Sequence, residues 1–336
     1  MERSYKVFNY TARLFTDFKF DNPFTGQFAQ AFDNFLEYYS PDLIVPSPQK
    51  KLLLSKKTDR VCRFCDQNSS STSFRKISHV MPKLMGNNYL IHDCECDSCN
   101  EKFGLYEDSL AKYIGMMRTA DRLKGYSGVP KFKSADGNLE MTLEKDENGI
   151  DVVSISYKSL ENFIKNDESV TLKTVKQSYT PLHVMKSLYK IGYSFLKSDE
   201  LHDYKLILKI LNTNVLDTKL SNFARIVKFT FPKSLKEPFA ITYKKKEDYL
   251  SKNIPTKIIV LHFGRYAYQY FLPNIKDRFM FTDGEQCEWI FTPPYYLGDQ
   301  NEISMQRTEL SSNVLRKGEV DTIFFKFDNI ALGGKK

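Results

Sequence analysis

Apolar side chains at helical spacing predict four helices along the chain. The first covers residues 28–39, where Phe, Leu and Tyr recur every three or four positions. A second pattern of the same period begins at Asn100 and reaches residue 117. A Thr-Pro pair, favoured at helix starts, opens a third helix at 180–196, and a fourth follows at 198–211.

Strand-like runs surround these helices. Residues 74–80 alternate apolar and polar positions up to a proline, and residues 89–91 follow after a Gly-Asn-Asn turn. Residues 139–144 and 150–157 flank a turn sequence and predict a hairpin. Further strands are predicted at 223–231, 239–243, 257–263, 266–272, 287–291 and 321–327. The whole pattern predicts an α+β fold.

Length and loop signals divide the chain. A sequence of 336 residues should hold more than one domain, since single cores are typically about 100 to 200 residues. We expect an N-terminal helical or extended segment at 1–57, a compact module at 58–130, a larger α+β domain at 131–330 and a frayed tail at 331–336. A proline-rich stretch at 46–51 is the predicted linker.

Composition indicates a cytoplasmic protein with no membrane partner. Hydrophobic residues make up 41% of the chain, enough for a core, but no apolar run approaches the roughly 20 residues of a membrane span. The N-terminus is mixed and charged, without an apolar signal core. Five of the six cysteines fall within residues 62–99, which is typical of a metal site in a reducing compartment rather than of a disulfide scaffold.

Two cysteine pairs predict a structural zinc site. Cys62 and Cys65 form one C-x-x-C pair, and Cys96 and Cys99 form the other. Four thiolates complete a tetrahedral shell, so this Zn²⁺ would have no open position for chemistry. Cys94 competes with this set, but the x-x spacing favours Cys96 and Cys99.

Charge is distributed unevenly around these pairs, within a net charge of +8. Residues 50–92 carry nine basic and two acidic side chains, whereas residues 93–108 carry six acids and one lysine. A basic surface beside an acidic pocket suits a phosphate backbone that meets a bound divalent cation. The same pattern also fits an ordinary solvated surface.

The order of motifs in residues 58–130 resembles the zinc-knuckle branch of the HNH (ββα-metal) endonucleases. It consists of C-x-x-C, His79 followed by x-x-Pro, a Gly-Asn loop, C-x-x-C-Asn and F-G-x-x-E-D. The resemblance implies a ββα-metal module that hydrolyses phosphodiester bonds, in DNA rather than RNA. Many such proteins serve in bacterial restriction or antiphage defence, so the resemblance also implies that setting.

Chemistry and resemblance together assign the site residues. An imidazole with a pKa near ~6.5 can take a proton from water, which makes His79 the candidate general base. Asn100 corresponds to the metal-binding His or Asn of HNH relatives, although it could simply cap the helix. Glu107 and Asp108 could add carboxylate oxygens for a catalytic Mg²⁺ or Mn²⁺, or lie on a solvated face. Asn88 is expected to orient His79.

Some positions leave alternatives open. Asn87 and His92 are other candidates for orienting His79, and both asparagines are also turn formers. Ser78 departs from the family pattern, because many HNH enzymes carry Asp, Glu or His before the base, as a metal ligand. Either another acid replaces it or the metal binds weakly.

The sequence therefore predicts a metal-dependent HNH endonuclease whose larger domain recognises the substrate, a partner or a signal. Two other functions fit the same residues. One is a non-catalytic zinc-ribbon module that binds nucleic acid. The other is an RNA nuclease.

Overall fold

The computed structural model describes residues 6–7, 26–45, 52–53, 60–158, 163–165, 169–221, 223–280, 287–288, 290–293 and 302–326. The helices are α1 (Gly26–Tyr38), α2 (Asp97–Ile114), α3 (Met117–Ala120), α4 (Pro181–Ser194), α5 (Lys205–Asn212) and α6 (Thr218–Ser221). The strands are β1 (Lys6–Val7), β2 (Tyr39–Val45), β3 (Leu52–Leu53), β4 (Ser78–His79), β5 (Leu90–His92), β6 (Phe132–Lys133), β7 (Leu139–Lys145), β8 (Asp151–Tyr157), β9 (Phe163–Lys165), β10 (Ser169–Val175), β11 (Arg225–Lys245), β12 (Lys257–Phe271), β13 (Ser304–Glu309) and β14 (Val320–Lys326). The predicted α+β class is confirmed, with all four predicted helices present.

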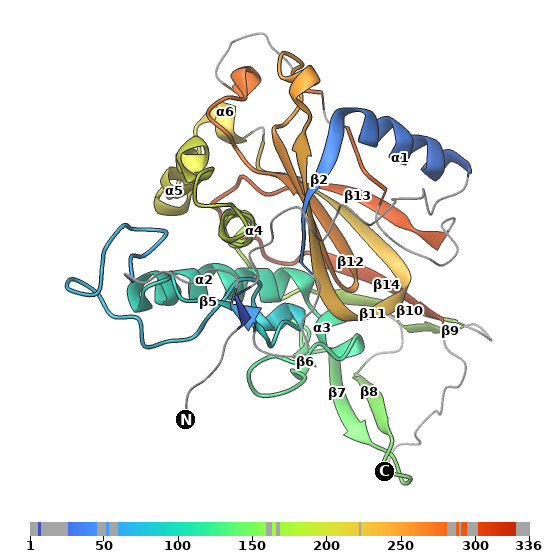
Figure 1. Cartoon of the computed structure of the whole chain (residues 1–336). Coiled ribbons are helices and arrows are strands. Elements are labelled where there is room, and N and C mark those ends of the chain that lie inside the picture. Colours follow the sequence, from blue (N-terminus) through green and yellow to red (C-terminus); the bar gives the residue numbers. More distant parts are fainter. Residues whose placement is uncertain are drawn as a thin grey trace.

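The largest sheet is built on two long antiparallel strands, β11 and β12 (Figure 1). The sequence predicted two short strands in place of each. Strand β11 continues through register shifts between Thr230 and Phe239, where Pro232 and Pro238 lack the N–H that a regular ladder needs. On its other edge β11 pairs with β13 over its first half and with β2 over its second half. The N-terminal segment thus contributes a strand to the C-terminal sheet.

Both faces of this sheet are buried. Along β12, Ile258 and Val260 contribute to the core on the α1 side, where Phe35 packs edge-on against Tyr243. Ile259 and Leu261 contribute to the other core, which includes α4 and α2. This alternation is the period of a strand, and it explains why β12 reads as a continuous apolar run.

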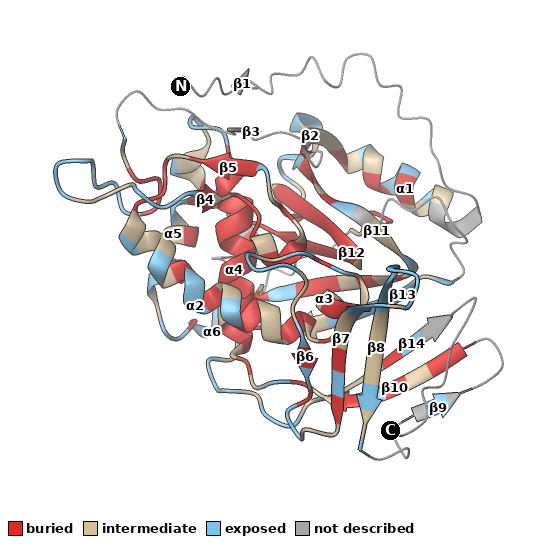
Figure 2. Ribbon diagram, turned by 90° about the horizontal axis from the view of Figure 1, so that it is seen from below, coloured by how far each residue is buried: buried red, intermediate tan, exposed pale blue. Residues whose placement is uncertain are grey.

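Helix α4 lies between the sheet and α2 and is buried on nearly every side (Figure 2). The hydroxyl of Tyr270 on β12 donates to the carbonyl of Leu188 at 2.7 Å. A Cβ at Gly192 would come within 2.5 Å of the Leu272 side chain, so glycine lets the helix lie this close to the end of β12 without a shift of that side chain. The sheet therefore fixes α4 against the module that contains the cysteines.

That module is a short hairpin followed by a helix. Strands β4 and β5 pair antiparallel, and β3 pairs with β5. The strand predicted at 74–80 is reduced to β4 because the Asp97 carboxylate accepts hydrogen bonds from Ser73 Oγ and from the amides of Arg75 and Lys76. These bonds hold the preceding loop at the N-terminus of α2. Gly104 lies within α2 without interrupting it.

Outside this module the predicted β-hairpin is present as β7 and β8. Strands β10 and β13 were not predicted, and the described residues of the strand predicted at 287–291 lie outside any strand. The linker at 46–51 and the tail at 331–336 lie outside the described residues. The domain boundaries themselves stay predictions.

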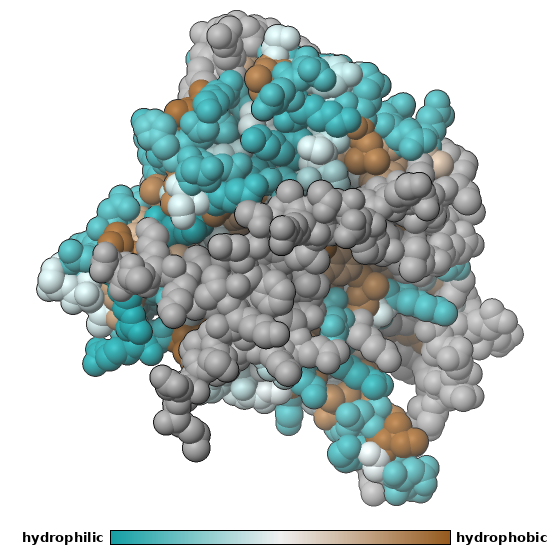
Figure 3. Space-filling model, viewed as in Figure 1, coloured by the Kyte–Doolittle hydropathy of each residue, from teal (hydrophilic) through white to brown (hydrophobic). Residues whose placement is uncertain are grey.

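The described part of the surface in Figure 3 is mainly hydrophilic, with hydrophobic side chains in small separate groups. Within the described ranges, no helix combines the length and the apolar content needed to cross a bilayer.

Candidate active site

The four cysteines predicted as zinc ligands meet at the N-terminus of α2. The Sγ atoms of Cys62, Cys65, Cys96 and Cys99 all lie within 4.8 Å of one another, and those of Cys65 and Cys96 are 3.7 Å apart. Sulfurs bound about 2.3 Å from a tetrahedral zinc would be separated by about 3.8 Å. The set fits a structural zinc ion, and the sequence prediction of this cluster is confirmed.

Cys94 lies outside the cluster. Its Sγ is 3.2 Å from Nδ1 of His92, on β5. The Sγ of Cys96 instead accepts a hydrogen bond from the Cys99 amide and so also caps α2. Helix α2 therefore begins at Asp97, three residues before the predicted Asn100.

His79 ends β4, where the sequence placed it, and is half-buried. Its Nδ1 is buried without a hydrogen-bond partner in the described part of the chain, and its carbonyl accepts from Lys190 Nζ at 2.8 Å. Burial lowers the pKa of His79 to about 4, helped by Lys83, Lys190 and His92 and opposed by Glu95. At neutral pH the imidazole is therefore uncharged, the form that can accept a proton.

The loop between β4 and β5 is held by Asn87. This side chain is buried, donates to the carbonyls of Met81 at 2.7 Å and Leu90 at 2.9 Å, and accepts from the Leu90 amide at 2.9 Å. Asn88, the residue predicted to orient His79, is half-buried and donates to Gly86 O at 3.3 Å, inside the turn. The geometry favours Asn87 over Asn88 for holding the His79 hairpin.

Asn100 faces the hairpin from the first turn of α2. Its Nδ2 donates to Ser78 Oγ at 3.1 Å and to Glu95 Oε1 at 2.9 Å. Both amide hydrogens of Asn100 thus have acceptors. Ser78 is 1% exposed and Glu95 is 2% exposed, so the acid that shares the Asn100 amide with Ser78 is a buried one.

Glu95 is the centre of a buried group of charges. Its Oε2 lies 3.2 Å from His92 Nε2 and 3.3 Å from Lys190 Nζ. Burial raises the pKa of Glu95, but these two cations outweigh burial and lower that pKa to about 2. Burial lowers the pKa of His92, but the neighbouring Cys94 and Glu95 outweigh burial and raise that pKa to about 9. His92 thus supports Glu95 rather than His79.

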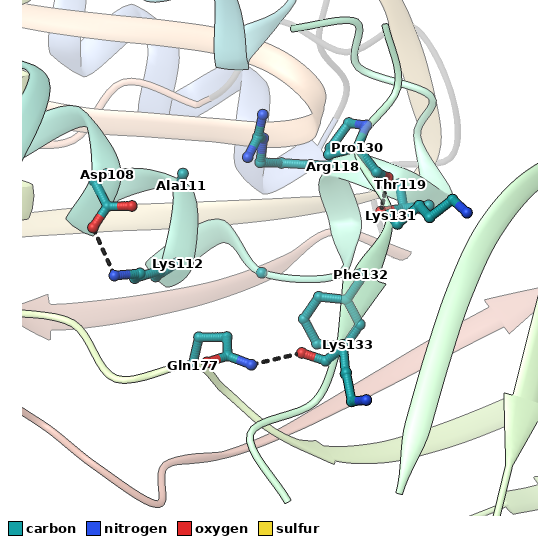
Figure 4. A pocket seen from close by; sticks show the side chains of 11 residues that line it. Asp108, Ala111, Lys112, Arg118, Thr119, Pro130, Lys131, Phe132, Lys133 and Gln177 are labelled. Atoms are coloured by element: carbon teal, nitrogen blue, oxygen red, sulfur yellow. Dashed lines mark hydrogen bonds and ion pairs between the residues drawn. The ribbon is translucent and has the colours of Figure 1, made fainter. Parts of the chain in front are cut away.

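The two acidic candidates on α2 point in different directions. Glu107 Oε1 lies 3.6 Å from Lys190 Nζ, and burial raises the pKa of Glu107 while Lys190 opposes this. Asp108 is exposed, pairs with Lys112 at 2.6 Å and lines a separate cleft (Figure 4). The structure places Glu107 beside Lys190, in the buried group of charges around Glu95, and leaves Asp108 outside that group.

The cleft in Figure 4 has a volume of about 320 Å³, and its charged lining residues are mainly basic. Lys112, Arg118, Lys131 and Lys133 line it, against the single acid Asp108. The Nε of Arg118 is buried and has no hydrogen-bond partner among the described residues. This lining is suited to an anion.

Sequence reasoning missed Glu95 and Lys190. Glu95 was counted only as part of an acidic run, although a charged residue between two buried cysteines needs a partner. Lys186 and Lys190 stand four residues apart in a largely apolar helix, a pattern that indicates buried lysines. The acidic partners of Lys190, Glu95 and Glu107, are far away in sequence, so the pattern could not identify them.

The comparisons with known proteins agree with this geometry. A family model described as HNH endonuclease matches residues 62–112, from the first cysteine to the last turns of α2. No curated protein matches the chain, and no solved structure does. The match covers the zinc cluster, the hairpin and α2, and it supports nuclease activity in general.

Proposed function

We propose that the protein is a metal-dependent endonuclease that hydrolyses phosphodiester bonds in DNA, because residues 62–112 match an HNH endonuclease family model. The observation that supports this most is that Asn100 donates to Ser78 Oγ, the residue directly before the uncharged, half-buried His79. Such a reaction needs a base for the attacking water and a cation for the charge on the phosphate.

In this proposal each residue has one task. His79 takes the proton from the attacking water, because its pKa near 4 keeps the ring unprotonated. Asn100 would hold Mg²⁺ or Mn²⁺ through Oδ1, an oxygen ligand that suits such hard cations, with Glu107 two turns along α2. The bound cation would neutralise charge on the phosphate. The zinc cluster keeps α2 and the hairpin in place.

The direct test uses purified protein with closed circular DNA and with RNA, each with Mg²⁺ or Mn²⁺ and each with EDTA. Cleavage of DNA that EDTA abolishes is the expected result. Cleavage of RNA alone would identify an RNA nuclease. Binding of either nucleic acid without cleavage would favour a non-catalytic zinc-ribbon module.

The biological role that we propose follows from the family resemblance, and the location follows from the cysteines. We propose a role in restriction or antiphage defence, which plaque counts in cells carrying wild type or His79→Ala would test. We propose a location in the reducing cytoplasm, because none of the six cysteines is in a disulfide and four of them gather as candidate zinc ligands. The larger α+β region would recognise the substrate, a partner or a signal.

The basic cleft gives a prediction about DNA binding. Lys131→Glu with Lys133→Glu should raise KM and reduce its salt dependence, with kcat nearly unchanged, because exposed lysines in the cleft would contact phosphates away from His79. Lys145→Glu is a control, since this exposed lysine lies at the end of β7 and outside the cleft. KM measured at several salt concentrations is the readout. An equal increase of KM in the control variant would show that the change in net charge, and not the cleft, weakens DNA binding.

The two neighbouring asparagines give another prediction. Asn87→Ala removes the partner of three buried backbone groups and should cost about 1–3 kcal/mol of unfolding free energy, with a cleavage rate at least roughly tenfold lower. Asn88→Ala removes the same chemical group one residue later and should change stability by about 0.5 kcal/mol or less. Denaturant unfolding and cleavage rates check both. The assignment fails if Asn88→Ala has the larger effect.

A further inference from the structure

Lys190 lies on α4, far outside the residues that match the HNH family, yet its ammonium group reaches the centre of the module. Lys190 is 1% exposed, and its Nζ donates to the His79 carbonyl at 2.8 Å. The same atom lies 3.3 Å from Glu95 Oε2 and 3.6 Å from Glu107 Oε1. One buried cation therefore contacts β4, the segment before α2, and α2 itself.

The module holds α4 in the position that makes these contacts possible. The guanidinium of Arg63, between the first two cysteines, donates to the carbonyls of Tyr193 at 3.1 Å and Leu196 at 2.8 Å. These carbonyls are at the C-terminal end of α4, where a helix accepts hydrogen bonds and favours positive charge. At the other side of the module, the Tyr106 hydroxyl donates to Leu211 O at 2.8 Å.

We propose that Lys190 is a positioning residue of the nuclease site, supplied by the α+β region. It acts on His79 directly, through the carbonyl, and on Asn100 indirectly, through Glu95. Glu95 Oε1 accepts one hydrogen of the Asn100 amide and Ser78 Oγ accepts the other, so the orientation of that amide depends on Glu95. This inference rests on the proposed nuclease function.

Removing the ammonium should disturb both contacts. The Glu95 side chain is fully inaccessible, and a buried carboxylate that loses a cation must find another partner, move or take up a proton. Any of these changes releases the Asn100 amide from its fixed orientation. Because Lys190 is buried, it does not touch the substrate. Its loss should therefore lower kcat and leave KM unchanged.

Lys186 offers a matched control on the same helix. It is one turn earlier, also 1% exposed, and donates to Tyr106 Oη and to the Thr213 carbonyl rather than to His79 or Glu95. Lys186→Met thus removes a buried ammonium from α4 without touching the proposed site.

The kinetic test measures kcat and KM for plasmid cleavage in Mg²⁺ with Lys190→Met, Lys186→Met, Glu95→Gln and the double variant Lys190→Met/Glu95→Gln. We expect a fall in kcat of ~10- to 100-fold for Lys190→Met, with KM unchanged and near wild-type values for Lys186→Met. Since Lys190 acts partly through Glu95, the double variant should lose less than the product of the two single losses. The double variant removes both charges together, so we expect it to be less destabilised than a single variant that leaves one of them unpaired. Wild-type kcat in Lys190→Met, losses that multiply, or an equal loss in Lys186→Met would overturn the proposal.

A second readout separates this inference from the proposed function. With ¹⁵N-labelled asparagine, the Asn100 side-chain amide should give a slowly exchanging, shifted NMR pair in wild type and Lys186→Met but an ordinary exchanging pair in Lys190→Met. An unchanged pair in Lys190→Met would contradict the positioning role even if the protein cleaves DNA. A wild type that cleaves nothing would contradict the proposed function, while the amide signal would still decide the role of Lys190.

Discussion

Replacing Cys62 or Cys99 by Ser should unfold the module at residues 60–130 and release its zinc. Structural zinc contributes about 10–16 kcal/mol in small zinc-binding modules, which matches or exceeds the roughly 5–15 kcal/mol total stability of a domain. The loss should spread beyond the cluster, because Cys96 caps α2 and Arg63 caps α4. Zinc content and thermal unfolding are the measurements, and wild type should hold one zinc per chain.

Two other cysteines provide the controls. Cys94→Ser should keep one zinc, since Cys94 lies beside His92 and outside the cluster. Cys287→Ser, in the other part of the chain, should keep both zinc and stability. The four-cysteine assignment is wrong if Cys94→Ser loses zinc while Cys99→Ser retains it.

Replacing His79 by Ala should lower the cleavage rate by ~10²- to 10⁴-fold, the usual contribution of a positioned proton acceptor. Thermal stability should change little, because the half-buried ring leaves Nδ1 without a hydrogen-bond partner among the described residues, and the contact with Lys190 uses the backbone carbonyl. Single-turnover rates with plasmid DNA check the first effect and calorimetry checks the second. A variant that cleaves at the wild-type rate would remove His79 from the mechanism.

The same assignment predicts the pH dependence of the wild type. A base works in its unprotonated form, so activity is lost as pH falls through its pKa. Burial, Lys83, Lys190 and His92 lower the pKa of His79 to about 4 against the opposing Glu95, so the rate should change little between pH 8 and pH 6. A rate that already falls by half near pH 6.5 would indicate an unperturbed histidine as the base.

Local patterns were sufficient to predict the parts of the fold that depend on short segments. The cysteine spacing identified the zinc cluster, and helical periodicity placed α1, α2 and α4 within a few residues. These local patterns failed where groups far apart in sequence determine the local structure. Cys96 caps α2 and moves its start to Asp97, and Asp97 binds the loop that was expected to be strand. Strand β13 is exposed along most of its length and so carries no apolar alternation.

The candidate site shows the same division. His79 and Asn100 were identified because they occupy fixed positions in a sequence motif. Glu95 and Lys190 were missed because their pairing joins residues 95 positions apart, between the segment before α2 and α4. The pairing of β2 with β11 and the packing of α4 on α2 likewise join segments far apart in sequence, which no local pattern records.

The central claim is that this HNH module cleaves DNA with a divalent cation other than its structural zinc. The most direct measurement takes zinc-loaded protein freed of other metals, adds Mg²⁺ or Mn²⁺ in steps, and follows nicking of closed circular DNA together with zinc content. The account predicts no cleavage before the addition, saturable cleavage after it, and one zinc per chain throughout. Full activity with zinc alone, or no cleavage with any added cation while the zinc stays bound, would contradict it.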